Sequence, residues 1–343
     1  MKAKAQFHEV TPDLYRSQLS SILNLRHELC RLAELIDWSK FDNEFGQFFP
    51  STTGCPATAT RLIVGLFYLK HAFKLSDEEL VARWVENPYW QYFCGEQYLQ
   101  HEFPVHPSSL SKWRRRLEES GCELMLQEMI QVGLKTGTIK KKDLQEAIVD
   151  TTVQEKAVTY PTDAKLYQRG RDKLVKLAKQ HGLALRQSYT RLGKRALFKA
   201  NRYFAAQQMK RGKKQVKKLK TYLGCVYRDI QRQLEQQVKL KPAFADLFQR
   251  VEKLLSQQKT DKNKLYSLHA PEVECIAKGK VNKRYEFGVK ISIVSTHKSN
   301  FVIGMQALSG NPYDGHTLKC SLDQVEKLTG ERPQSCYVDL GYR

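Results

Sequence analysis

The stretch Ala147-Ile148-Val149-Asp150-Thr151-Thr152-Val153 predicts a short apolar strand with a carboxylate at its centre. A second run, Cys336-Tyr337-Val338-Asp339-Leu340-Gly341, has the same character. A carboxylate in a buried strand is costly unless it is paired or binds a cation. In open α/β sheets reactive groups lie just beyond the carboxyl ends of strands, and the position of Asp339 fits this rule. We expect Asp150 and Asp339 to face one crevice, although either aspartate taken singly could instead serve a turn or a cap.

The residues between these runs predict a mixed α/β fold. Residues 285–294 alternate with period two, as a half-buried strand does, and residues 301–308 predict its hairpin partner. The turn at 311–316 predicts the start of a helix that ends near Leu328, and 336–339 the next strand. The expected order is therefore a strand, a helical insertion, a hairpin, a helix and a strand that ends in aspartate.

The first 140 residues predict a domain of short helices. One covers 58–73; Ser76-Asp77-Glu78-Glu79 is a capping box that starts another, and Pro88 ends or bends that helix. A further helix begins at 106–109 and closes near Gly121. It carries Arg114, Arg115 and Arg116, which resembles a helix-turn-helix arrangement with these cations in the DNA major groove. The alternative is a helical core with a solvated basic edge.

Charge is the most unusual property of the composition. The chain has 343 residues and a net charge of +21, which indicates a polyanionic partner, nucleic acid first and an anionic membrane second. Residues 165–241 hold 23 Lys and Arg against three acids, a balance of +20. An apolar stripe of Val216, Leu219, Leu223 and Val226 predicts a packed helix under this charge. We favour contact with the phosphate backbone of DNA over a solvated face. The densest cations are Lys210, Arg211, Lys213, Lys214, Lys217, Lys218 and Lys220.

No membrane-spanning or signal segment is predicted. The longest apolar run, 62–69, is far shorter than the roughly 18–20 residues that span a bilayer, and the first residues lack an apolar core. The eight cysteines are scattered singly, without a CxxC pair, so a zinc site is not expected. Reduced thiols in a cytoplasmic protein are the expected state.

A carboxylate pair in a basic protein suggests metal-dependent chemistry on phosphodiesters. Cleavage needs an activated oxygen nucleophile and a stabilised leaving oxygen, and two Mg²⁺ ions about 3.5–4 Å apart supply both. Mg²⁺ takes hard oxygen ligands and keeps several waters, so a few carboxylates suffice. Mn²⁺ has similar preferences.

Several segments in this order resemble bacterial insertion-sequence transposases of the DDE class, whose catalytic domain is RNase H-like. The resemblance covers nearly the whole chain, and its most specific part is Val149-Asp150-Thr151-Thr152-Val153-Gln154-Glu155-Lys156 followed by Tyr160-Pro161-Thr162-Asp163-Ala164-Lys165-Leu166. Other matching segments are 35–38, 56–62, 75–80, 107–114, Tyr285-Glu286-Phe287-Gly288-Val289-Lys290 and Tyr337-Val338-Asp339-Leu340-Gly341-Tyr342-Arg343.

The resemblance implies a helical DNA-binding domain over 1–140 and a catalytic domain over 141–343, with the basic helical insertion at about 163–262. Asp150 and Asp339 become the first two catalytic acids and ligands of two Mg²⁺ or Mn²⁺ ions. Asp314 and His316 fall in a loop that such enzymes place near the site, although Asp314 fits an N-cap equally well. The implied activity is nicking at transposon ends and strand transfer into target DNA. The implied partners are double-stranded DNA with terminal inverted repeats, target DNA and a second copy of the chain in a dimer at the bacterial nucleoid.

One departure from the family pattern concerns the third acid. The family has a glutamate on a helix downstream of the second aspartate, and this sequence ends at Arg343. The sheet is therefore expected to be incomplete, and the polypeptide alone is expected not to transpose. A truncated, non-catalytic DNA-binding remnant or inhibitor of transposition is the main alternative. Another RNase H-like nuclease and a basic RNA-binding protein are the other candidates; no RRM-like aromatic platform favours the last.

Overall fold

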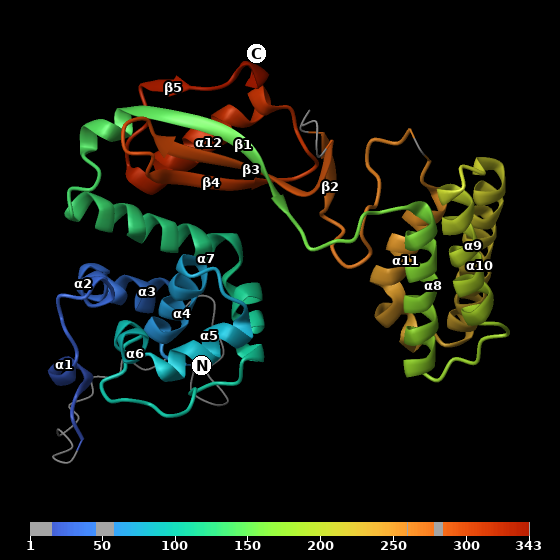
Figure 1. The fold of residues 1–343 in the computed structure, drawn as a ribbon, viewed down its shortest axis with the longest axis horizontal. Coiled ribbons are helices and arrows are strands. Elements are labelled where there is room, and N and C mark those ends of the chain that lie inside the picture. The colour runs from blue at the N-terminus through green and yellow to red at the C-terminus, as the bar shows by residue number, and fades with distance from the viewer. Residues whose placement is uncertain (1–15, 46–57, 259, 278–283, 343) are drawn as a thin grey trace. The chain divides into compact units, whose positions relative to one another are not determined.

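The computed structural model describes residues 16–45, 58–258, 260–277 and 284–342 (Figure 1). Cys55, Pro56, Ala57 and Arg343, which belong to patterns discussed above, lie outside these ranges. The chain divides into two compact units. The first consists of Met1–Val149, Val294–Met305 and Lys319–Val338, and the second of Asp150–Ile293, Gln306–Leu318 and Asp339–Arg343. The fold is mixed α/β with a large helical part, as the sequence predicts.

The first unit begins with a cluster of helices around an aromatic core. The largest core side chains include Phe41, Phe67, Trp84 and Phe93, all almost fully buried. Apolar side chains at helical spacing bring these helices together. The helices are α1 (Leu19–Ile22), α2 (Glu28–Leu35), α3 (Trp38–Glu44), α4 (Thr60–Ala72), α5 (Asp77–Glu86), α6 (Pro88–Phe93) and α7 (Ser108–Lys135).

Helix boundaries in this cluster confirm most of the predicted signals. Ser76 accepts from the backbone N–H of Glu79, and the Glu79 side chain accepts from that of Ser76, which completes the capping box. Pro88 separates two helices because it stands in the first turn of α6, after the N-cap Asn87. The predicted end of this helix near Gly121 falls close to a kink in α7. Glu118 leaves helical geometry there (φ 48°), so one helix ends near Leu117 and a second continues from the kink to Lys135.

Five strands form one mixed sheet. They are β1 (Glu146–Glu155), β2 (Glu274–Ala277), β3 (Tyr285–Thr296), β4 (Val302–Leu308) and β5 (Ser335–Tyr337). Their order is β2-β3-β1-β5, and β4 also pairs with β3. β2 and β3 are antiparallel, whereas β1 and β5 are parallel with the register 146↔335, 147↔336 and 148↔337. The predicted last strand is shorter than expected, since it ends at Tyr337 and leaves Asp339 two residues beyond it.

The period-two pattern of β3 is confirmed, but its polar side chains lie on the more buried face. Glu286, Lys290 and Ser292 are buried, whereas the apolar residues between them are half-buried. Helix α12 (Asp314–Thr329) follows β4, as predicted. In the first unit Val325 of this helix packs against the strands, because a Cβ on Gly304 would lie 2.9 Å from Val325 Cγ2.

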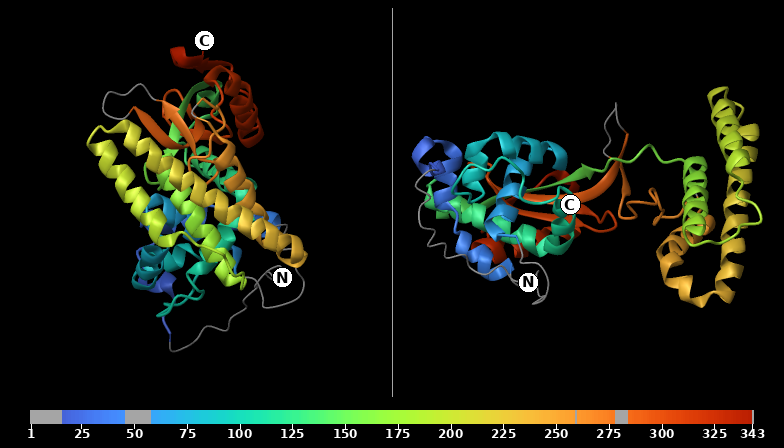
Figure 2. Two further views of the ribbon diagram at one scale, coloured as in Figure 1. Left: turned by 90° about the vertical axis from the view of Figure 1, so that its right-hand side faces the viewer. Right: turned by 90° about the horizontal axis from the view of Figure 1, so that it is seen from below.

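The predicted insertion is a helical block within the second unit. It consists of α8 (Asp163–Gln180), α9 (Thr190–Ala205), α10 (Met209–Gln236) and α11 (Lys241–Ser256). Figure 2 shows α9 and α10 as long neighbouring helices joined by a tight turn. They approach closely, since a Cβ on Gly212 of α10 would lie 2.5 Å from the Phe204 ring of α9. Leu219, Leu223 and Val226 of the predicted stripe are buried in the core of this block, which confirms the packed helix.

Short 3₁₀ helices complete the secondary structure. They are η2 (Lys141–Gln145), which precedes β1, η3 (Val238–Leu240), and η4 (Leu340–Tyr342), which follows Asp339. Among the helices that the model describes, none is long and apolar enough to cross a membrane.

Candidate active site and nucleic-acid interface

Asp150 occupies the centre of β1, but its side chain is exposed. The sequence suggested a buried carboxylate, and this part of the prediction is wrong. β1 is buried on one face only: Ala147, Val149 and Thr151 point inward, and successive strand residues point to opposite faces. Asp150 therefore projects from the face opposite to Thr151. An exposed carboxylate keeps its hydration at little cost, so it needs no buried counter-charge.

A polar cluster ties β1 and β3 to the first turn of α12 within the second unit. The hydroxyl of Thr151 donates to Asp314 Oδ1 over 2.8 Å, and Lys290 Nζ lies 2.5 Å from the same oxygen. Lys290 Nζ also donates to the carbonyl oxygen of Pro312 over 2.9 Å. Lys290 is only 9% exposed, so its charge is compensated almost entirely by these partners. Asp314 is thus held in one orientation through one of its two oxygens.

Asp339 lies in a turn that brings its carboxylate toward Asp314. Its Oδ1 accepts a 2.9 Å hydrogen bond from the backbone N–H of Gly341. A Cβ on Gly341 would lie 3.0 Å from Asp339 Oδ1 and 3.5 Å from Asp314 Oδ2. The two carboxylates therefore converge on the bare Cα of Gly341. The chain then passes over the start of α12, since a Cβ on Gly315 would lie 2.7 Å from the carbonyl oxygen of Tyr342.

His316 belongs to the same turn as Asp314. Its backbone N–H donates to the carbonyl oxygen of Tyr313, and its ring stands edge-on to the Tyr313 ring at 5.5 Å between centroids. The structure thus brings Asp314 next to Asp339, and His316 shares the first turn of α12 with Asp314. Within the described ranges, no group of three or more His, Cys, Asp or Glu side chains is arranged to hold a metal ion.

Helix α10 presents the predicted basic residues to solvent. Lys210, Arg211, Lys213, Lys214, Lys217 and Lys218 are exposed, and Lys220 is half-buried. The apolar stripe lies on the opposite side of α10 and packs into the core of the helical block. The cations therefore stand on the solvent-facing side of α10, opposite its packed side.

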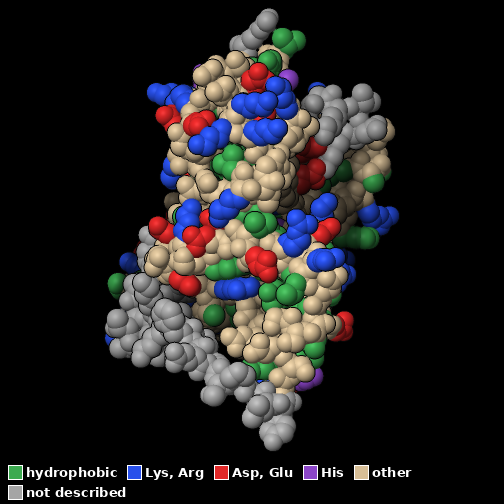
Figure 3. All heavy atoms as spheres, turned by 90° about the vertical axis from the view of Figure 1, so that its left-hand side faces the viewer, with side chains coloured by type: hydrophobic (Ala, Val, Ile, Leu, Met, Phe, Trp, Pro, Cys, Tyr) green, Lys and Arg blue, Asp and Glu red, His purple; other side chains and the backbone are tan. Residues whose placement is uncertain are grey.

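Helix α9 adds a second row of cations that the sequence analysis did not single out. Arg191, Lys194, Arg195, Lys199 and Arg202 are all exposed. Phe198 stands among them with 62% of its surface exposed, and the Arg202 guanidinium lies 5.8 Å from the centre of its ring. The sequence does contain a signal that could have identified these cations: no Asp or Glu occurs between Asp172 and Asp229. Elsewhere the charges are mixed: on the face drawn in Figure 3, Lys and Arg stand among Asp and Glu.

Arg114 has a different environment from its two neighbours. Its guanidinium forms two hydrogen bonds with the Asp77 carboxylate, of 2.8 and 2.5 Å, and Lys70 also pairs with Asp77. The hydrogen bond from Arg114, followed by that from Lys70, lowers the pKa of Asp77 to about 2. Arg114 thus fastens α7 to the start of α5, while Arg115 and Arg116 on the same helix are exposed.

Comparisons with known proteins identify the class. Residues 17–116, which extend from before α1 into α7, match the model of a transposase domain (DUF772). The chain belongs to a transposase family, and transposases act on DNA.

A relative in Rhizobium meliloti, the uncharacterised protein ORF8 in the nfe locus, is 52% identical to this chain over 196 residues. The alignment covers 57% of this chain and 94% of the relative, so the two are members of one family. No solved structure matches the chain.

Proposed function

We propose that the chain is a DNA transposase of the DDE class in which Asp150 and Asp339 are the first two catalytic acids. The parallel register of β1 and β5 carries this proposal. It pairs Ile148 with Tyr337, and Asp150 and Asp339 each follow two residues after this last pair. Two acids far apart in sequence thus belong to adjacent parallel strands, Asp150 within β1 and Asp339 just beyond the carboxyl end of β5, where α/β enzymes place reactive groups.

The donor atoms suit Mg²⁺ or Mn²⁺. Asp150 and Asp339 offer exposed carboxylate oxygens, which are the hard ligands that these ions prefer, and Asp314 lies beside Asp339. We assign the metal to Asp150 and Asp339; when bound, it would activate the attacking oxygen and neutralise charge on the leaving oxygen. The protein orients the acids: the N–H of Gly341 fixes Asp339, and Lys290 with Thr151 fixes Asp314.

The order of elements supports an RNase H-like catalytic domain. From Asp150 onward the chain forms a strand, a helical insertion, a hairpin, a helix and a strand, in the order that the resemblance implies. The central strand carries the first acid, and its parallel neighbour leads to the second.

The substrate that fits the surface is double-stranded DNA. The cations of α9 and α10 lie on a helical block whose residues 173–228 contain no acid, so it attracts the phosphate backbone without opposing charge. Backbone contact supplies affinity and register. We assign recognition of terminal inverted repeats to the N-terminal helices with Arg115 and Arg116, and we expect two copies to act on paired ends.

A second candidate is a DNA-binding protein without catalysis, which occupies transposon ends and inhibits transposition. The exposed cations of α9 and α10 favour it in one respect, because they can bind a phosphate backbone without any metal ion. Both candidates share the cationic helices and differ in what Asp150 and Asp339 do.

Cleavage of end DNA by the full chain separates the two candidates. The substrate is a labelled duplex with the terminal inverted repeat of the element, incubated with Mg²⁺ or Mn²⁺ and with EDTA. We compare the wild type with Asp150→Asn and Asp339→Asn. Asp246→Asn is the matched control, since this carboxylate is 90% exposed on α11.

A transposase nicks the duplex only with metal, and both site variants abolish nicking while they bind DNA as tightly as the control. Binding without nicking by any form supports the inhibitor. Nicking that persists in Asp150→Asn and Asp339→Asn contradicts the assignment of the two acids.

A further inference from the structure

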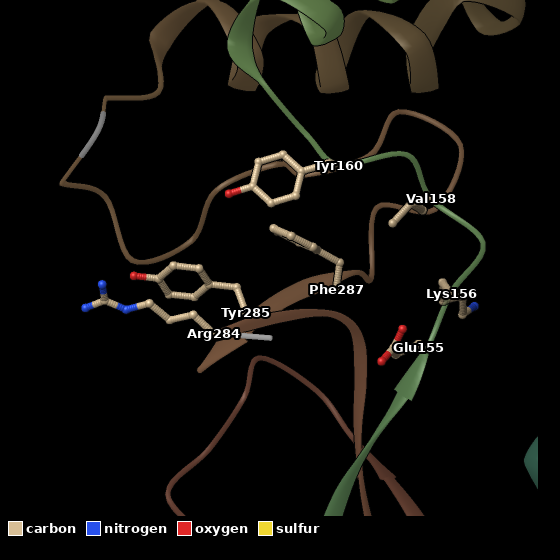
Figure 4. A pocket seen from close by; sticks show the side chains of 7 residues that line it. All are labelled: Glu155, Lys156, Val158, Tyr160, Arg284, Tyr285 and Phe287. Atoms are coloured by element: carbon tan, nitrogen blue, oxygen red, sulfur yellow. The ribbon is translucent and has the colours of Figure 1, made fainter. Parts of the chain in front are cut away.

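A pocket of about 480 Å³ lies where β1 ends and β3 begins (Figure 4). It belongs wholly to the second unit and is separate from the acids discussed above. Its size is in the range of small-ligand sites. Aromatic and cationic side chains dominate its lining, which consists of Glu155, Lys156, Val158, Tyr160, Arg284, Tyr285 and Phe287.

Three aromatic rings shape the pocket. The ring of Phe287 stands edge-on to that of Tyr160, with 5.3 Å between centroids, and Tyr266 supports Phe287 at 5.7 Å. Figure 4 shows Tyr160 and Tyr285 on either side of Phe287, with both phenol oxygens pointing the same way. Tyr160 is 61% and Tyr285 40% exposed. Rings of this size usually bury their faces, so two exposed rings beside one cavity offer stacking surface for a flat apolar group.

Strand geometry keeps the pocket in place. The backbones of β1 and β3 meet closely beneath it: a Cβ on Gly288 would lie 2.1 Å from the carbonyl oxygen of Gln154. The N–H of Lys156 donates to the carbonyl oxygen of Phe287 over 3.1 Å, and Lys156 Nζ pairs with Glu272 at 2.6 Å. Tyr285 and Phe287 are therefore mounted on paired strands, which lowers the entropic cost of binding, while Tyr160 lies in the loop after β1.

One cation stands over a ring of the pocket. The Arg284 guanidinium lies 5.6 Å from the centre of the Tyr285 ring, at the rim of the pocket. The segment 155–160 also lines a second pocket of about 340 Å³ through Ala157 and Thr159, where Arg169, Lys173 and His269 are found with one acid, Asp172. Burial, followed by the nearby Arg250 and Arg169, lowers the pKa of Lys173. Cations crowded in this way favour an anion as partner.

We propose that the pocket formed by Tyr160, Tyr285 and Phe287 binds an unpaired nucleobase of a DNA strand. This inference rests on the proposed action on DNA. Stacking on exposed aromatic rings beside cations is how proteins hold single-stranded nucleic acid, because every base has a flat π-face. A base inside a duplex is covered on both faces by its neighbours, so only an unpaired or extruded base can enter. Arg284 contacts the phosphate beside the bound base.

Fluorescence of 2-aminopurine tests the proposal on the full chain. One probe carries 2-aminopurine opposite an abasic position in a duplex, and a second carries it fully paired in the same sequence. Stacking on a tyrosine quenches the unpaired probe. The variants are Tyr160→Leu and Tyr285→Leu, which keep apolar volume without a ring, and Tyr160→Phe and Tyr285→Phe, which keep the ring.

We expect the wild type to prefer the unpaired probe over the paired one by about tenfold, in line with the contribution of one stacked base. Both leucine variants lose the preference and the quenching, both phenylalanine variants retain them, and all five proteins bind the paired duplex equally. Phe198→Ala is a control that removes the exposed aromatic ring of α9, outside the pocket. Loss of quenching in this variant alone would place the base on α9 and overturn the proposal.

Failure of the proposal and failure of the DNA-binding function give different results. Tight binding of the paired duplex without any preference for the unpaired probe refutes the pocket while the function stands. No binding of either probe refutes the function itself, and the pocket proposal with it.

Discussion

The hydroxyl of Thr151 donates a 2.8 Å hydrogen bond to Asp314 Oδ1 and so joins the strand of Asp150 to the first turn of α12. Thr151 is buried, and it is the residue next to the first proposed catalytic acid. Its role is therefore to position the helix that carries Asp314, while Asp150 points away from this contact. The same oxygen of Asp314 also pairs with Lys290.

Loss of this hydroxyl should destabilise the protein. Thr151→Val keeps the shape but leaves Asp314 with one hydrogen bond fewer, and we expect the free energy of unfolding to fall by about 1 kcal/mol. Thr151→Ser keeps the donor and should lose less. Urea unfolding followed by circular dichroism measures both variants. Equal stability of Thr151→Val and the wild type would show that the hydrogen bond contributes nothing net.

Removal of the buried lysine should cost more. Lys290→Met leaves the Asp314 carboxylate without its cation, and we expect a loss of about 2 kcal/mol, less than for a fully buried pair because Asp314 is 24% exposed. The double variant Lys290→Met with Asp314→Asn should recover part of that loss. Unfolding of all four proteins gives the coupling energy. Additive effects of the two changes would mean that the ion pair is not coupled.

Local signals in the sequence predicted local structure well. The capping box of Ser76 and Glu79, the role of Pro88 and the apolar stripe of α10 depend on residues a few positions apart, and all three are confirmed. Their physics is contained in one helix turn or one helix face. The helix end near Gly121 was predicted close to the kink at Glu118, but the second helix, which continues to Lys135, was not predicted, because Gly121 lies within it and packs against Leu117.

Tertiary pairings could not be predicted in the same way. Lys290 follows the alternation of β3, which gives no indication that its polar face is the more buried one. Its partner Asp314 lies beyond a hairpin and a turn. Arg114 belongs to a basic triplet typical of a DNA-contacting helix, yet Asp77 from another helix holds it. In each case the interacting partner is far away in sequence. Composition and hydrophobic periodicity therefore carry no information about it.

The cations of α10 should control the salt dependence of DNA binding. We expect Lys213, Lys214, Lys217 and Lys218, changed together to Gln, to weaken binding of any duplex and to reduce the slope of log K against log salt by about 3 to 4. Fluorescence anisotropy at several salt concentrations measures the slope. The matched control neutralises Lys141, Lys142, Lys298 and Lys319, which are exposed outside the helical block. A slope equal in both fourfold variants would exclude α10 as the backbone contact.

Stability below pH 4 should depend on the ion pair between Asp77 of α5 and Arg114 of α7. The pKa of Asp77 is lowered from 3.8 to about 2 in the folded state, so this carboxylate stabilises the protein above pH 4 and the contribution is lost as pH falls from about 4 to 2. We expect this loss to be about 2 kcal/mol, and Asp77→Asn to remove that part of the acid dependence. Urea unfolding between pH 2 and 5 measures it. An unchanged pH profile in Asp77→Asn would contradict the lowered pKa.

The absence of a side chain at Gly341 should matter for metal binding more than for stability. Its φ lies outside the left-handed region, so the backbone accepts alanine, but the new Cβ would lie 3.0 Å from Asp339 Oδ1 and 3.5 Å from Asp314 Oδ2. The methyl group must push one carboxylate away. If Asp339 binds Mn²⁺ as proposed, Gly341→Ala should weaken Mn²⁺ binding about tenfold, as displaced ligands and their supports commonly do. Electron paramagnetic resonance of free Mn²⁺ measures the affinity.

Gly224→Ala in α10 is the control, because its Cβ meets only the flexible end of Arg228 and should leave Mn²⁺ binding unchanged. Wild-type affinity in Gly341→Ala, with unchanged stability, would place the metal away from Asp339.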